Sequence, residues 1–268
     1  MLRFTMFSAA ACLTLTQAAA AQIHRDVNLL IEDGKLVTGA VNFDLPGDPV
    51  EPGARVFSAT LGEGIAHFTD DPGFNAPGGT FDSGTNVGFD ILDALWKYNE
   101  TTQRFDIVPA ETLFVGLSVL SRTTPTTPAT TVTGFNFAAI GGSGGMHQHI
   151  NFFLNAPQGD GIYLYISRIT SDDASIEHTD PIYVLFNESL DPVVLDEAIQ
   201  VVEANIVDPQ CPGDTNSDGR VDFADLNTLL ANWDRDVPVG TDADVTLDGR
   251  VDFADLNEVL GNWDSTCS

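Results

Sequence analysis

Basic residues are scarce in this sequence. Its 268 residues include 11 lysines and arginines against 39 aspartates and glutamates, for a net charge of −28. A surface of this charge repels phosphate backbones and anionic lipid head groups, which excludes nucleic acid as a partner. Cations are the partners that such a surface favours.

Long apolar runs are missing beyond the first 21 residues, MLRFTMFSAAACLTLTQAAAA. These combine a positive charge at Arg3, an apolar stretch, and small residues at Ala19 and Ala21, a pattern typical of a secretory signal peptide cleaved before Gln22. No later stretch approaches the roughly 20 apolar residues of a membrane-spanning helix, so we expect no direct membrane insertion. We expect a secreted protein, extracellular or at the cell surface.

Cysteine is also rare. Cys12 falls in the predicted signal peptide, which leaves Cys211 and Cys267 in the mature chain. An exported pair that brackets one compact segment is most simply a disulfide, and closing that loop would stabilise the fold by roughly 4 kcal/mol.

Catalytic signatures are absent from the sequence. It contains no nucleophile elbow, phosphate-binding loop or zinc-protease helix. Its many carboxylates could be paired on paper as a glycosidase acid and nucleophile, but a sequence does not give their separation. We therefore assign no catalytic residue and favour a non-catalytic protein, with an enzyme as the open alternative.

An internal repeat occupies the last part of the chain. GRVDFADLNTLLANWD from Gly219 recurs as GRVDFADLNEVLGNWD from Gly249, each copy after an acidic run. On the calcium-loop template, each unit places oxygen donors at positions 1, 3, 5, 7, 9 and 12, with glycine at position 6 for the turn. The donors of the first loop are Asp214, Asn216, Asp218, Arg220 through its carbonyl, Asp222 and Asp225. Those of the second loop are Asp244, Thr246, Asp248, Arg250 through its carbonyl, Asp252 and Asp255.

Two calcium ions are therefore predicted, because Ca²⁺ takes six to eight oxygen ligands. We expect the second site to be the weaker, since Thr246 offers a hydroxyl or carbonyl where Asn216 offers an amide oxygen. After each loop, apolar residues at i, i+3, i+6 and i+7 predict one short helix with an apolar face. The faces comprise Phe223, Leu226, Leu229 and Leu230, and Phe253, Leu256, Val259 and Leu260.

The segment from Pro212 to Trp263 resembles a type I dockerin, the duplicated calcium-loop module that docks onto cohesin domains of extracellular scaffolds. The resemblance implies a small all-α module over residues 211–268 and a cohesin-like or other extracellular protein partner. Near-identical repeats would let that partner bind in two orientations related by pseudo-twofold symmetry. The small hydroxyl residues that this family carries at loop positions 10 and 11 are replaced here by Phe-Ala in both loops, which leaves the partner's identity open.

Residues 22–190 have a different sequence pattern. Runs such as ETLFVGLSVL, HINFFLN and GIYLYISRIT are separated by Gly, Pro, Asn and Asp, which predicts an antiparallel β-sandwich and a mainly β protein. We expect a short helix at Phe89–Leu95 and a flexible polar insertion at Arg122–Thr133. Residues 191–210 are predicted to be a helical linker, with a helix over Asp191–Asn205.

Histidines suggest a second kind of metal site. His147 and His149 are two residues apart, so on a strand both imidazoles would face one ion. His24, two residues before Asp26, is the best third ligand, with His67 behind it. Zinc or copper would accept such nitrogens, and His24 could alternatively bind Cu(II) together with a free amine at Gln22. The alternative to a metal site is that these histidines belong to a polar surface or to a hydrogen-bonded core.

Three pieces of this domain resemble one family of secreted bacterial surface domains: IHRDVNLLIEDGKLVTG, FTDDPGFNAPGGTFDSGTNVGFDILDALWKYN and HQHINFFLNAPQGDGIYLYISRI. The family includes exported proteins controlled by the zinc-uptake repressor and related domains that carry interchangeable C-terminal anchors. Its motifs are matched at His24, Asp26, His147, His149, Gly161 and Tyr163. The resemblance implies a role in extracellular zinc binding or acquisition.

Three functions are compatible with this reading. The first is a non-catalytic, zinc-type surface protein tethered through its calcium module. The second is a polysaccharide-degrading enzyme or carbohydrate-binding protein delivered to a cohesin-type scaffold, and the third is a structural matrix component.

Overall fold

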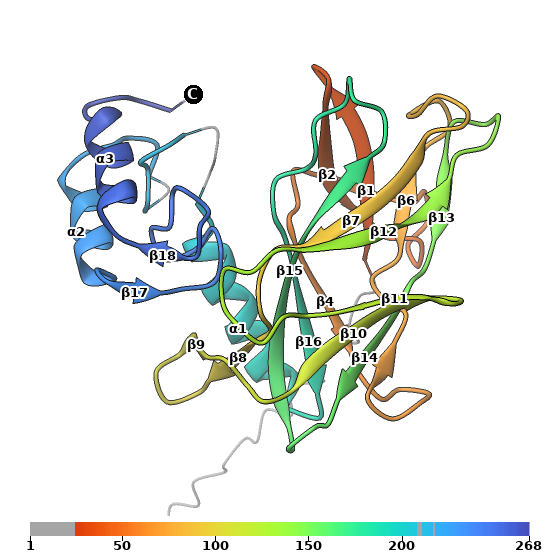
Figure 1. Ribbon diagram of the computed structural model, residues 1–268, viewed down its shortest axis with the longest axis horizontal. Coiled ribbons are helices and arrows are strands. Elements are labelled where there is room, and N and C mark those ends of the chain that lie inside the picture. The colour runs from red at the N-terminus through yellow and green to blue at the C-terminus, as the bar shows by residue number, and fades with distance from the viewer. Residues whose placement is uncertain (1–24, 208–210, 217, 268) are drawn as a thin grey trace, which may run out of the picture.

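The computed structural model describes residues 25–207, 211–216 and 218–267. The predicted signal peptide, Gln22 and the candidate ligand His24 lie outside the described residues. Within them the chain is mainly β, with the strands gathered beside a smaller helical part (Figure 1). The prediction of a mainly β fold is confirmed.

The largest sheet has seven strands. Its path is β12-β7-β15-β16-β4, and β8 pairs with β15 and with β9 beside that path. The strands are β4 (Val56–Thr60), β7 (Asn86–Ile91), β8 (Trp96–Asn99), β9 (Arg104–Ile107), β12 (Val132–Ala139), β15 (Gly161–Ser171) and β16 (Ile182–Glu188).

Two smaller sheets lie against one face of the seven-stranded sheet. The first, in the order β13-β6-β1-β2-β3, comprises β1 (Asp26–Glu32), β2 (Lys35–Val41), β3 (Val50–Pro52), β6 (Phe74–Ala76) and β13 (Met146–Gln148). The second, in the order β11-β10-β14-β5, comprises β5 (Phe68–Thr69), β10 (Thr112–Leu117), β11 (Leu120–Thr123) and β14 (Asn151–Asn155). One cluster of buried side chains draws residues from all three sheets and forms the main core of a β-sandwich.

Most neighbouring strands are antiparallel, as expected, but two pairs are parallel. β1 pairs in parallel with β6, and β16 with β4. Each parallel pair joins strands that are far apart in sequence, so no hairpin turn marks them in the sequence. The purely antiparallel arrangement is therefore corrected to a mixed one.

The central strands β15 and β16 are buried on both faces. Tyr163 and Tyr165 point into the main core, whereas Ile162 and Leu164 belong to a second buried cluster on the other face. Double burial explains why these strands read as continuous apolar runs rather than as alternating ones.

Helix α1 (Pro192–Asn205) covers part of that second face. Asp191 caps this helix by accepting a hydrogen bond from the Val193 N–H. Pro192 suits the first turn, because backbone N–H groups there have no acceptor within the helix and proline has no N–H. The buried residues of α1 are Leu195, Ala198 and Val202, and the helix predicted over Asp191–Asn205 is confirmed. The segment expected to be a linker thus contributes to a packed layer.

The C-terminal part consists of two loop-helix units. The loops lead into α2 (Phe223–Ala231) and α3 (Phe253–Gly261), and each helix begins with a capping box, Asp222 with Asp225 and Asp252 with Asp255. The short strands β17 (Arg235–Asp236) and β18 (Arg250–Val251) pair, so this part is not purely helical.

The two loop-helix units pack against each other through aromatic side chains. Phe223 packs edge-on against Trp263, and Phe253 packs in the same way against Trp233, with ring centroids 5.0 Å apart in both pairs. Each predicted apolar face is split, because Leu229 and Val259 are buried whereas both phenylalanines are 70% exposed. The disulfide between Cys211 and Cys267 is present and joins the two ends of this part.

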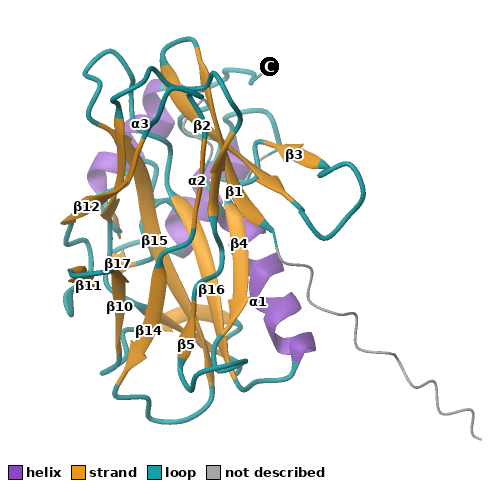
Figure 2. Ribbon diagram, turned by 90° about the vertical axis from the view of Figure 1, so that its right-hand side faces the viewer, coloured by secondary structure: helices purple, strands orange, loops and turns teal. Residues whose placement is uncertain are grey.

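The second loop-helix unit is fastened to the β domain through Asp93. This fully buried carboxylate accepts hydrogen bonds from Ala94 N, Ala129 N and Trp96 Nε1, and at 3.2 Å from Val239 N of the C-terminal part. Burial raises the pKa of Asp93 despite these four donors. Figure 2, turned by 90°, shows the helices of the C-terminal part behind the strands.

Tyr183 of β16 makes a second connection. Its hydroxyl lies 3.2 Å from the Val239 carbonyl and 3.3 Å from that of Gly240. A Cβ on Gly240 would stand 2.5 Å from that hydroxyl, so this close approach requires glycine. A third contact comes from Arg104, which donates to Asn232 Oδ1.

Two local predictions were wrong. Residues 89–91 end strand β7 instead of beginning a helix, because Phe89 and Ile91 point into the main core. The polar segment 122–133 is not a free insertion: its ends belong to β11 and β12, and Ala129 bonds Asp93. Among the described residues, no helix is long and apolar enough to cross a membrane.

Candidate functional site

Three strands bring one carboxylate and two imidazoles together. In the order β13-β6-β1, His147 lies opposite Asn75, and Asn75 lies opposite Asn28. Asp26 precedes Asn28 by two residues and therefore shares its face, while Val27 between them points into the core. His149 follows directly after β13, so the register alone gathers Asp26, His147 and His149.

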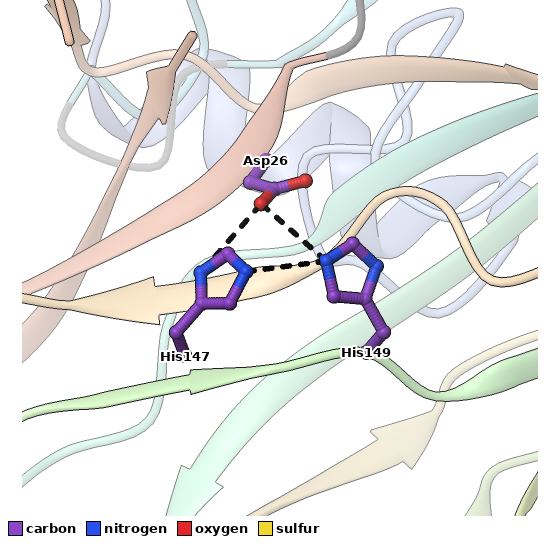
Figure 3. A group of neighbouring side chains, drawn as sticks. All are labelled: Asp26, His147 and His149. Carbon is purple, nitrogen blue, oxygen red and sulfur yellow. Dashed lines mark hydrogen bonds and ion pairs between the residues drawn. The ribbon is translucent and has the colours of Figure 1, made fainter. Parts of the chain in front are cut away.

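Asp26 faces both imidazoles, and the two imidazoles face each other (Figure 3). The two Nε2 atoms are 3.3 Å apart, and Asp26 Oδ2 lies 3.9 Å from His147 Nδ1 and from His149 Nε2. Two nitrogens bound to one tetrahedral zinc ion stand about 3.3 Å apart. Asp26 Oδ2 is about 0.6 Å farther than this from His149 Nε2, and its 3.9 Å contact on His147 is to Nδ1, the ring nitrogen that does not face His149. Binding one ion would therefore require the half-exposed His147 ring to turn so that one nitrogen faces both partners.

Hydrogen bonds orient two of these ligands. His149 Nδ1 lies 2.9 Å from the Asp70 carbonyl, which can only accept, so Nδ1 carries a proton and Nε2 is the nitrogen that faces the group. Asp26 Oδ1 accepts from the Gly73 N–H at 2.8 Å, which leaves Oδ2 facing the imidazoles. Backbone hydrogen bonds of this kind fix the orientation of metal-binding imidazoles and carboxylates in known metal sites.

Gly73 makes room for the group. A Cβ at this position would come within 2.7 Å of His149 Nε2 and within 2.9 Å of Asp26 Oδ2. The requirement is spatial, because the backbone of Gly73 does not have a positive φ. The absence of a side chain here thus allows His149 and Asp26 to approach each other.

Replacing Gly73 with alanine is therefore expected to weaken zinc binding by at least about tenfold, the range found for residues that support metal ligands. Isothermal titration with Zn²⁺ measures the change. Gly141→Ala is the control, since a Cβ there meets nothing within 4 Å. Equal affinities in the two variants would contradict this role.

The remaining candidates lie elsewhere. His67 Nδ1 pairs with the buried Glu188 Oε1 at 2.8 Å, which removes His67 as a ligand of this group. His24 is outside the described residues. Sequence reasoning missed Gly73 and the Asp70 carbonyl, whose only signal is the run DDPGF.

The two repeat loops have matching hydrogen-bond frames. In the first, Asp214 accepts from the N–H groups of Asp218 and Gly219, and Asp225 accepts from those of Thr215 and Asp222. In the second, Asp244 accepts from the N–H groups of Asp248 and Gly249, and Asp255 accepts from those of Thr246 and Asp252 and from the Thr246 hydroxyl. The Thr246 N–H corresponds to that of Asn216, which also donates to Asp225. These hydrogen bonds fold the backbone of each loop around the carboxylates at its first and last positions.

Burial of these carboxylates favours a cation. Asp214, Asp225, Asp244 and Asp255 are all buried. Burial, assisted by the nearby Asp255, raises the pKa of Asp244 to about 7. Among the described residues, no three carboxylates of one loop come within 4.8 Å of one another, so the loop oxygens are more widely spaced than the atoms of the histidine group.

Comparison with known proteins adds no family. Neither a protein-family model nor a curated protein matches this chain.

Proposed function

We propose that this chain is a non-catalytic, extracellular protein that binds a zinc-type ion through Asp26, His147 and His149. The observation that carries the proposal is the convergence of two imidazoles and a buried carboxylate with one imidazole already oriented by a backbone carbonyl. Imidazole nitrogen suits Zn²⁺ or Cu²⁺ and is a poor ligand for Ca²⁺ or Mg²⁺, which prefer oxygen.

The second part of the proposal is that residues 211–268 form a calcium-dependent, dockerin-like module that binds an extracellular protein partner such as a cohesin-like domain. It is supported by the paired loop frames and by apolar side chains left on the surface of both helices and just beyond α3. The exposed residues are Phe223, Leu230, Phe253, Leu260 and Trp263. Exposed apolar residues that recur at equivalent positions are typical of a protein-binding surface.

The polysaccharide-acting alternative receives less support. A sugar-binding cleft needs exposed aromatic rings, whereas Trp96 of the β domain is 2% exposed and donates its Nε1 hydrogen to Asp93. Its role in this fold is structural.

Replacing His147 and His149 together with alanine is expected to lower zinc affinity by more than about 100-fold, because loss of direct ligands exceeds the 10- to 100-fold cost of losing supporting residues. Metal analysis of protein purified without added ions, followed by titration calorimetry, provides the measurement. His178→Ala, an exposed histidine outside the group, is the control. Equal zinc stoichiometry in the double variant and the wild type would rule the site out.

A further inference from the structure

A cavity opens directly in front of the Asp26–His147–His149 group. Its volume is about 520 Å³, and the residues that line it are Asp26, Phe43, Asp44, Asp71, Asn75, His147 and His149. Among the described residues the group provides three ligand atoms, and a zinc-type ion takes four or more. At least one coordination position would therefore face this cavity.

The chemistry of the lining selects what can enter. Asp44 and Asp71 add two carboxylates. Asn75 donates its amide N–H to Asn28 Oδ1, so the side-chain oxygen of Asn75 is a further acceptor. No lysine or arginine is among the lining residues. With a divalent ion in place, three carboxylates against two positive charges leave the cavity with a net charge of −1, so anionic ligands are repelled.

Phe43 gives the cavity an aromatic wall. Its ring stands edge-on to the His147 ring with centroids 5.0 Å apart, and it is 45% exposed. A second flat ring placed beside it would find an aromatic partner at a favourable distance.

We propose that the cavity admits one external imidazole, such as the side chain of a histidine-bearing ligand, as an additional ligand of the bound ion, in preference to anions. The inference rests on the proposed metal site and adds its ligand class. Three features converge on it: an unfilled coordination position, acceptor groups that suit a neutral ring with an N–H, and the Phe43 wall.

Cobalt loading of the full chain tests the inference, because Co²⁺ accepts zinc ligands and its visible absorption bands report its coordination. Adding free imidazole at millimolar concentration is expected to shift these bands, with azide binding at least about fivefold more weakly because of the carboxylates. Asp44→Asn removes one negative charge and keeps one acceptor oxygen, so it is expected to raise the affinity for azide relative to that for imidazole by about fivefold.

The outcomes separate the two proposals. If no cobalt bands appear, the metal site itself is wrong and this inference falls with it. If bands appear but imidazole does not shift them, the metal site stands and the open position is refuted; a shift restored in His24→Ala would then identify His24 as the occupant. Azide binding as tightly as imidazole would overturn the proposed selectivity.

Discussion

Replacing Asp93 with alanine is expected to lower the free energy of unfolding by about 4 kcal/mol or more, because each of its four buried donors left without an acceptor costs about 1–3 kcal/mol. Two of the four donors face each carboxylate oxygen: Ala94 and Ala129 bond Oδ1, and Trp96 and Val239 bond Oδ2. The fully buried position leaves these groups little access to replacement water. Urea unfolding followed by tryptophan fluorescence measures the loss.

A graded series makes this test specific. Asp93→Asn keeps one acceptor oxygen and is expected to fall between wild type and Asp93→Ala. Asp160→Ala removes an exposed aspartate and should leave the midpoint of unfolding unchanged. A midpoint for Asp93→Ala equal to that of Asp160→Ala would show that the C-terminal part is not held through Asp93.

The attachment of the C-terminal part explains which features the sequence could predict. The repeat and its two helices were predicted, because calcium-loop spacing and helical periodicity are local. Docking onto the β domain was not, since Asp93, Tyr183 and Val239 are brought together only by tertiary folding. The unbroken apolar runs of β15 and β16 are the one sequence signal for it, as a strand buried on both faces needs a cover on each.

Only part of the histidine group could likewise be predicted from the sequence. His147 and His149 follow from the two-residue period of a strand, and Asp26 was added through a resemblance. The parallel pairing of β1 with β6, which places Asp26 beside them, joins segments more than 40 residues apart and has no local mark. Gly73 could not be assigned a role from the sequence, because its importance depends on the close approach of His149 and Asp26 in the folded chain.

Removing calcium with excess chelator is expected to unfold most of residues 211–268, because four buried carboxylates then lack a counter-charge. An ion present at 1,000 times its dissociation constant contributes about 4 kcal/mol for each site. Hydrogen exchange, read over α2 and α3, and far-ultraviolet circular dichroism are the measurements. The disulfide keeps the ends of this part together, so added Ca²⁺ should restore the signal.

The two loops are expected to respond unequally even though their sequences nearly match. Asp244 accepts an additional hydrogen bond from Gly240, whose carbonyl in turn lies within reach of the Tyr183 hydroxyl and accepts from Val207, so the second loop is connected to the β domain. Asp225→Asn and Asp255→Asn make the same change at loop position 12 and serve as controls for each other.

Asp255→Asn should therefore also loosen α1 and the outer face of β16, and should lower the free energy of unfolding by about 1–2 kcal/mol more than Asp225→Asn, roughly the worth of the connecting hydrogen bonds. Equal losses would mean that the two loops are energetically independent of the β domain. A circular dichroism spectrum unchanged by the chelator would refute calcium-dependent folding of both loops, because the backbone N–H donors and protonation would then suffice to offset the burial of Asp214, Asp225, Asp244 and Asp255.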